Sequence, residues 1–142
     1  NQANQFTNKA LQLAAEDDEQ RELQMTVLAL KTLQKFLNPR HLSIQAARAN
    51  VLNTSLAQGD VKIAYEQCKE LCCAYDEIYP TDRPHPIRAL QLCTLGELLC
   101  HSEKYDESIE VLKRARDELK VTHGPYNGLV ESVEVNIRNL TI

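Results

Sequence analysis

Apolar residues recur at every third or fourth position along most of this 142-residue chain, and this spacing restricts its folding to helices. The spacing places a stripe of side chains on one helix face, which must then be buried against another element. Proline lacks an N–H group and is excluded from helix interiors, so it marks connections and first turns. All five prolines lie between the periodic segments: Pro39, Pro80, Pro84, Pro86 and Pro125. The sequence therefore predicts an all-α protein of about seven helices.

Seven apolar stripes define the expected helices. In chain order they run from Phe6 to Leu13, Leu23 to Leu37, Ile44 to Ser55, Ala64 to Tyr75, Leu92 to Leu99, Tyr105 to Leu119 and Val130 to Leu140. In the last stripe, Val133, Val135 and Ile137 also fit the alternation of a strand, so both structures stay open there.

A run of acidic residues precedes the second stripe: Glu16, Asp17, Asp18, Glu19 and Glu22. Carboxylates at a helix N-terminus are stabilised by unpaired N–H groups and by the positive end of the helix dipole. We therefore expect a new helix to begin at this run, separate from a short first helix over residues 6–13. The alternative is an acidic recognition patch.

Charge and composition bear on the classes of partner and on location. The formal net charge is −4, and the 16 lysines and arginines form no basic stripe, so nucleic acid is not an expected partner. No apolar run approaches the ~18 residues of a membrane span, and no signal peptide is visible, so we expect no membrane association. Five cysteines without such a signal favour a reducing compartment, the cytoplasm or the nucleus. Because the chain begins with Asn1, we expect it to be part of a larger protein.

Gly96 lies in the middle of a predicted helix, where glycine costs about 1 kcal/mol relative to alanine. The close approach of a neighbouring helix would explain this choice. The helix-turn-helix repeat of the TPR type requires a small residue at its eighth position and another small residue twelve positions later. Residues 89–120 meet this requirement with Gly96 and Ser108. Residues 45–76 follow the pattern more loosely, with a turn expected at Gly59-Asp60. The two units lie 44 residues apart because Tyr79 to His85 form an inserted loop.

Repeats of this kind stack as antiparallel helix pairs in a right-handed superhelix and present a concave surface to partners. Helix geometry predicts the residues that face this groove. They are Asn50, Asn53, Thr94, Glu97 and His101.

Three sequence motifs support a family resemblance. Tyr79–Leu92 contains a tyrosine-proline pair and a histidine-proline pair, Leu95-Gly96 continues a leucine-rich helix, and Val121–Gly124 ends the next helix with histidine-glycine. In this order the motifs resemble the C-terminal TPR-like domain of the SMYD family, protein-lysine methyltransferases with a SET domain and a MYND zinc finger. The resemblance covers residues 41–124 and extends without motifs over residues 1–40. Asn127-Gly128 replaces a second histidine-proline pair found in many members, and we expect Asn127 to cap the final helix.

The resemblance implies a parent enzyme that transfers a methyl group from S-adenosylmethionine to a protein lysine. The catalytic, cofactor-binding and zinc-binding residues of that family belong to other domains, so this chain is expected to be non-catalytic and to hold no cofactor. It would form one wall of the substrate cleft and a surface for protein or peptide partners. The alternative function is a free-standing TPR-like adaptor that binds peptides or chaperones.

The expected organisation is a single domain over residues 1–142. Residues 1–40 would form the junction with the catalytic lobe through Phe6, Leu11 and Leu13, and residues 41–142 would hold the repeats and a final helix.

The resemblance also makes the chaperone Hsp90 a possible partner. TPR domains that bind the terminal carboxylates of a chaperone use a lysine and an asparagine four residues apart. Here these positions hold Ala49 and Asn53 in one repeat and Cys93 and Glu97 in the other. Any Hsp90 contact would therefore use a mode other than this carboxylate clamp.

The cysteines and histidines receive structural interpretations. Cys68 and Cys72 share a helix face, whereas Cys73 points about 100° away, so three free cysteines are favoured over a zinc site. Cys93 and Cys100 also suit packing, with a reactive thiol beside His101 as the alternative. We expect His85 to fix the entry to a helix and His123 to lie at a helix C-terminus, where a cation is favoured.

Overall fold

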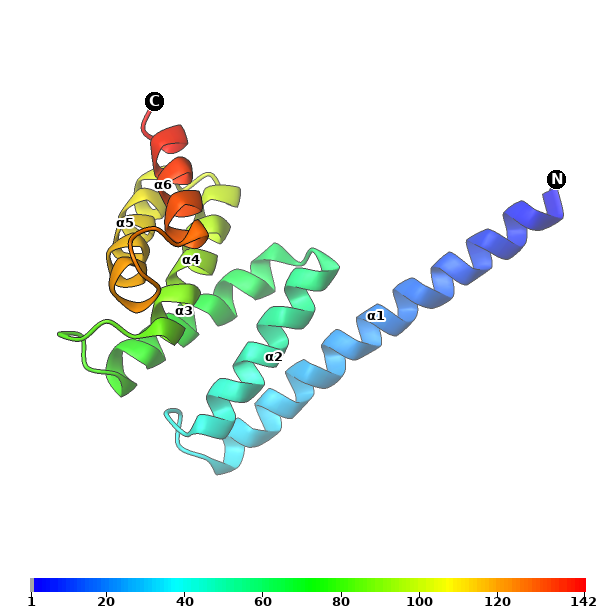
Figure 1. Cartoon of the computed structure of the whole chain (residues 1–142). Coiled ribbons are helices and arrows are strands. Elements are labelled where there is room, and N and C mark those ends of the chain that lie inside the picture. The colour runs from blue at the N-terminus through cyan, green and yellow to red at the C-terminus, as the bar shows by residue number, and fades with distance from the viewer. Residues whose placement is uncertain (1) are drawn as a thin grey trace. The chain divides into compact units, whose positions relative to one another are not determined.

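The computed structural model describes residues 2–142, which form six α-helices and no strand (Figure 1). The chain divides into two compact units, Asn1–Asp60 and Val61–Ile142. Over residues 2–142, no helix combines the length and the apolar character needed to cross a membrane. The prediction of an all-α protein is confirmed.

The first unit is a pair of helices, α1 (Gln2–Phe36) and α2 (Leu42–Gln58), that pack against each other. The turn between them contains Pro39. The side chain of His41 caps α2 by accepting a hydrogen bond from the Ser43 N–H group at 3.1 Å. Gly59 ends α2 with φ at 75°, a left-handed conformation that glycine adopts without steric cost.

The predicted start of a helix at the acidic run was wrong. α1 continues through Glu16–Glu22, so the first two expected helices are one and the chain has six helices instead of seven. No proline or glycine interrupts residues 2–36, and glutamate is itself a good helix former. Asp17 also forms an i,i+4 ion pair with Arg21 at 3.0 Å, which stabilises a helix interior slightly.

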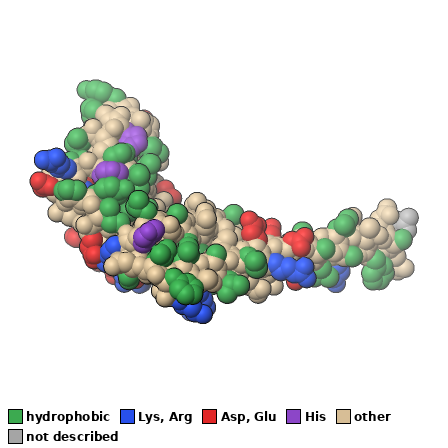
Figure 2. Space-filling view, turned by 90° about the horizontal axis from the view of Figure 1, so that it is seen from below, with side chains coloured by type: hydrophobic (Ala, Val, Ile, Leu, Met, Phe, Trp, Pro, Cys, Tyr) green, Lys and Arg blue, Asp and Glu red, His purple; other side chains and the backbone are tan. Residues whose placement is uncertain are grey.

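The first half of α1 has no packing partner within its unit. Every residue from 2 to 22 is exposed, and Leu30 is the fully buried residue of the helix. The C-terminus of α2 reaches only to Glu19, whose carbonyl accepts a hydrogen bond from the Gln58 amide. Figure 2 shows hydrophobic side chains on the surface of this part of α1, at the right of the view.

The second unit packs four helices in chain order, each against the next. The helices are α3 (Val61–Ile78), α4 (Pro86–His101), α5 (Tyr105–Thr122) and α6 (Gly128–Leu140). One core cluster joins the last three of them through Ala89, Leu112, Leu119, Val130, Val133 and Ile137. For the segment that ends the chain, the helical alternative is therefore correct. Val135, which a strand would have aligned with Val133 and Ile137, is exposed.

Gly96 lies at the crossing of α4 and α5, as its place in the sequence predicts. A Cβ atom built there would lie 2.6 Å from Leu112 Cγ and closer still to Leu112 Cδ2, a separation that real atoms do not tolerate. The buried hydroxyl of Ser108 donates a hydrogen bond of 2.6 Å to the Gly96 carbonyl. Two small residues thus allow the helices to pack closely and satisfy a backbone acceptor at the same point.

The better of the two predicted repeats, residues 89–120, corresponds to α4, a tight turn and α5. The looser repeat, residues 45–76, spans α2 and α3, which belong to different units. Its helices and its turn at Gly59 lie where the sequence predicts, while their packing as a repeat stays a prediction.

Candidate functional site

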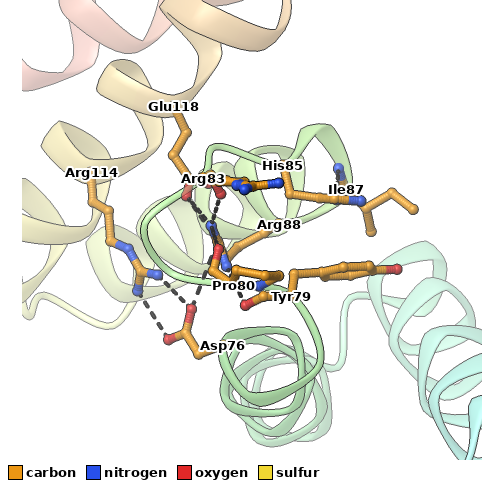
Figure 3. A network of polar contacts seen from close by, with 9 residues as sticks. All are labelled: Asp76, Tyr79, Pro80, Arg83, His85, Ile87, Arg88, Arg114 and Glu118. Atoms are coloured by element: carbon orange, nitrogen blue, oxygen red, sulfur yellow. Dashed lines mark hydrogen bonds and ion pairs between the residues drawn. The ribbon is translucent and has the colours of Figure 1, made fainter.

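The loop from Tyr79 to His85 is fixed at both ends by side chains. His85 caps α4, because its Nδ1 atom accepts a hydrogen bond from the Ile87 N–H group at 3.2 Å. The His85 ring also stacks on Tyr79, with centroids 3.7 Å apart and planes 13° from parallel (Figure 3). The expected role of His85 at the helix entry is confirmed.

Arg88 holds this loop from the inside. Its side chain is fully buried and donates hydrogen bonds to three loop carbonyls, those of Tyr79 at 3.1 Å, Pro80 at 3.3 Å and Arg83 at 2.7 Å. Its Nε and Nη2 atoms also lie 2.8 and 2.7 Å from Oε1 of Glu118 in α5. Figure 3 shows the guanidinium at the centre of these contacts.

A second ion pair extends the network toward α3. Arg114 in α5 binds both carboxylate oxygens of Asp76, and this hydrogen bonding raises the pKa of Arg114. Asp76 Oδ1 also lies 3.8 Å from Arg88 Nε. Because a buried charge is stable only when it is paired and hydrogen-bonded, the network ties the loop, α3 and α5 together. Its role is therefore structural.

The buried role of Arg88 was not predicted from the sequence. A signal was available, since Arg88 lies one helical turn before Leu92 and so continues the buried stripe of α4. A charged residue on such a stripe indicates a buried partner.

A cavity of about 440 Å³ lies beside the loop. It is lined by Thr81, Asp82, Pro84, Arg114, Asp117 and Glu118. Most of its charged groups are already engaged, because Arg114 binds Asp76 and Glu118 binds Arg88. Asp117 contacts the neighbouring Arg116. Few charges are left to recognise a ligand.

The residues predicted to face a groove fall in both units. Thr94, Glu97 and His101 lie at helical spacing on α4, and Glu97 and His101 are exposed while Thr94 is half-buried. Asn50 and Asn53 are exposed on α2, in the first unit. Whether the two sets share one surface stays a prediction.

A smaller cavity opens beside Glu97 in the second unit, with a volume of about 270 Å³. It lies between α4 and α6, and the almost fully buried Leu112 of α5 contributes to its base. The contribution of α6 was not predicted, because the expected groove residues came only from the helices of the two repeats. The lining residues are Glu97, Cys100, Leu112, Asn136, Asn139 and Leu140.

The five cysteines are free thiols. Cys68 and Cys72 are buried as expected, while Cys73 is exposed. The hydrogen bond with Cys68, together with burial, raises the pKa of Cys72. Burial also raises the pKa of Cys93 to about 11, so this thiol is uncharged at neutral pH. Within residues 2–142, no three side chains of histidine, cysteine, aspartate or glutamate form a group able to hold a metal ion.

The end of α5 matches the sequence prediction. His123 is the C-cap residue and its N–H group bonds to the Leu119 carbonyl. Gly124 follows with φ at 91°, and Asn127 then caps α6 by accepting a hydrogen bond from the Leu129 N–H group at 2.9 Å.

Comparison with solved structures identifies the fold. A candidate kinesin light chain from Podospora anserina, with nearly identical TPR-like repeats, superposes with a TM-score of 0.72 at 15% identity. The alignment covers 94% of this chain and 62% of that one. A single-substitution variant of the same protein gives a TM-score of 0.70 at 16% identity, over 89% and 59% of the two chains. The described chain therefore has a TPR-like helical repeat fold.

Comparison of sequences gives a narrower result. No protein-family model matches the chain. The chain is similar to the mouse histone-lysine N-methyltransferase SMYD3, with 35% identity over 49 residues. That match covers 34% of this chain and 11% of the mouse protein. The fold is thus shown over nearly the whole chain, whereas likeness to a methyltransferase is limited to about a third of it.

Proposed function

We propose that this chain is a non-catalytic protein-interaction domain that forms the C-terminal part of a protein-lysine methyltransferase of the SET and MYND type. The observation that carries the proposal is the 49-residue likeness to mouse SMYD3, found in a chain with a TPR-like fold. Helical repeats of this kind act mainly by presenting extended surfaces to partners. In the parent protein, the domain would form part of the cleft that admits the protein substrate.

The exposed first half of α1 supports a junction with another lobe. Phe6, Leu11 and Leu13 are 74%, 65% and 56% exposed, and Phe6 and Leu13 share one helix face. Most of the stability of a helix in a protein comes from the packing of its apolar face, so a neighbour that covers these side chains would stabilise this half of α1. We propose the catalytic lobe as that neighbour, with the S-adenosylmethionine and zinc sites in the parent's other domains. The free thiols are consistent with a cytoplasmic or nuclear location.

A second candidate function is a free-standing adaptor that binds peptides or chaperones. The structural likeness to a protein with TPR-like repeats favours it, because that likeness covers 94% of the chain. Contact with Hsp90 would need a mode other than the carboxylate clamp. Of the two α4 residues at the clamp positions, Cys93 is an uncharged thiol and Glu97 is an acid, and neither attracts a carboxylate.

Methyl transfer by the full-length product of the gene that encodes this chain tests the proposal. Three proteins would each be incubated with radiolabelled S-adenosylmethionine and purified histones. They are the full-length protein, the present chain alone, and the full-length protein without residues 1–142. We expect transfer to histone by the full-length protein, no transfer by the chain alone, and weaker transfer by the shortened protein.

Two results would contradict the methyltransferase assignment. One is a full-length product that neither binds S-adenosylmethionine in calorimetry nor transfers its methyl group to any protein in a cell extract. The other is a shortened protein that methylates every substrate as fast as the full-length protein. The first result, combined with peptide binding by the chain alone, would favour the adaptor.

A further inference from the structure

The cavity between α4 and α6 combines an apolar interior with an open polar edge. Leu112, which is 1% exposed, and the half-buried Leu140 and Cys100 supply apolar lining. A volume of about 270 Å³ is large enough for an aliphatic or aromatic side chain. Burial of such a side chain in a site of this kind is favourable because it removes apolar surface from water.

Two side-chain amides stand at this cavity, Asn136 and Asn139 on successive turns of α6. Neither makes a hydrogen bond to any other residue in the part of the chain that the structure describes. Each amide offers a carbonyl acceptor and an NH₂ donor. An extended peptide carries the complementary pair, an N–H and a C=O group on each residue, and it needs partners for both when it docks.

Glu97 provides the charge of the site. It is the one ionisable group with a full negative charge among the lining residues, and no basic residue lines the cavity. Glu97 is exposed and forms no ion pair within residues 2–142. Cys93, one turn earlier on α4, contributes no charge at neutral pH because its pKa is about 11. A complementary ligand therefore carries a positively charged group next to its apolar side chain.

We infer that this cavity is a docking site for an extended peptide segment in which a lysine or arginine lies next to a large apolar residue. The apolar side chain enters the cavity over Leu112, Asn136 and Asn139 bond to the peptide backbone, and the basic side chain pairs with Glu97. This inference rests on the proposed protein-interaction function and specifies its partner. The site would prefer a basic residue, whereas a carboxylate clamp prefers the acidic terminal group of its ligand.

A peptide library tests the site. Random eight-residue peptides displayed on phage would be selected on the purified chain, and the affinities of the enriched sequences would be measured by fluorescence polarisation. We expect enrichment of peptides with a basic residue adjacent to leucine, methionine or phenylalanine. Glu97→Lys should weaken their binding at least tenfold and shift selection toward acidic peptides, because it reverses the charge of the site. Asn136→Ala and Asn139→Ala should each weaken binding about fivefold, the effect of one lost hydrogen bond.

Glu110→Lys is the matched control, since it makes the same charge change at an exposed site on α5 that does not line the cavity. Circular dichroism would verify that all variants fold. Enriched peptides that bind Glu97→Lys and Glu110→Lys equally well would overturn the site while leaving an interaction function in place. Enrichment of acidic or purely apolar peptides by the unaltered chain, or no enrichment at all, would overturn the peptide chemistry. Methyl transfer by the full-length protein would still test the parent function separately.

Discussion

At Gly96 the lack of a side chain determines how closely two helices can pack. The space that a methyl group would need is occupied by Leu112 from α5, and the Gly96 carbonyl is bonded to the buried Ser108 hydroxyl. Glycine lowers the intrinsic stability of α4, and the close crossing compensates for it. Replacing Gly96 by alanine improves the helix propensity but introduces a steric clash. Because the two effects on stability have opposite signs, mutants can separate them.

Gly96→Ala should lower the free energy of unfolding by up to about 2 kcal/mol. The added methyl group overpacks the crossing, which typically costs about 1–3 kcal/mol, while the better helix propensity of alanine returns about 1 kcal/mol. In a Leu112→Ala background the clash is absent, so the same change should stabilise the protein by about 1 kcal/mol. Urea unfolding followed by circular dichroism measures all four proteins of this cycle. Destabilisation of the same size in both backgrounds would show that Leu112 does not crowd residue 96.

The sequence was informative at this residue for a physical reason. A glycine inside a strong helical pattern is costly, so its presence pointed to a neighbour, and the small residue twelve positions later identified the partner helix. The contacts of Arg88 could not be predicted in the same way. They depend on three carbonyls of an irregular loop and on Glu118, thirty residues away, and no local pattern specifies such an arrangement.

At the level of elements, the loop Tyr79–His85 is held in place chiefly by one buried side chain. Arg88 bonds to the loop and to α5, and Glu118 is its buried counter-ion. The partly exposed pair of Arg114 and Asp76 lies beside it. Each arginine is hydrogen-bonded to one carboxylate, but Arg88 is fully buried and Arg114 is not, so the two ion pairs can be compared directly.

Arg88→Met should destabilise the chain by about 3–5 kcal/mol, because it leaves the Glu118 carboxylate buried without a partner. Arg114→Met, the matched control, should cost no more than about 1 kcal/mol, since its pair is open to solvent. The double variant Arg88→Met, Glu118→Met should recover only part of the loss, because it removes the unpaired carboxylate but leaves the three loop carbonyls without their donor. Chemical denaturation provides the comparison, and equal losses for the two arginine variants would contradict the role assigned to Arg88.

Element boundaries were predictable where prolines and capping residues define them, and not elsewhere. Pro86, Gly59 and Asn127 identified helix ends that the structure places at the same positions. The false boundary at Glu16–Glu22 arose because acidic residues favour a helix start but do not require one. Without a proline or glycine nearby, the helix simply continues.

At the scale of the whole molecule, the first half of α1 has exposed apolar side chains that nothing in its own unit covers. Its second half packs on α2, whereas residues 2–22 are exposed along their entire length and include large apolar side chains. The candidate groove could be predicted only in part, because Glu97 follows from the spacing along α4 but Asn136 and Asn139 reach the same cavity only through the packing of α6. The proposed interaction domain attached to a catalytic lobe would account for both surfaces.

Hydrogen exchange of α1, compared between the isolated chain and the full-length gene product, tests this account most directly. Amides of residues 2–22 should exchange rapidly in the isolated chain, since an unpacked helix opens at little cost in free energy, while those around Leu30 exchange slowly. In the full-length protein, residues 2–22 should become protected, and α5 should exchange as before. Equally fast exchange of residues 2–22 in both proteins would contradict the claim that another lobe covers this helix.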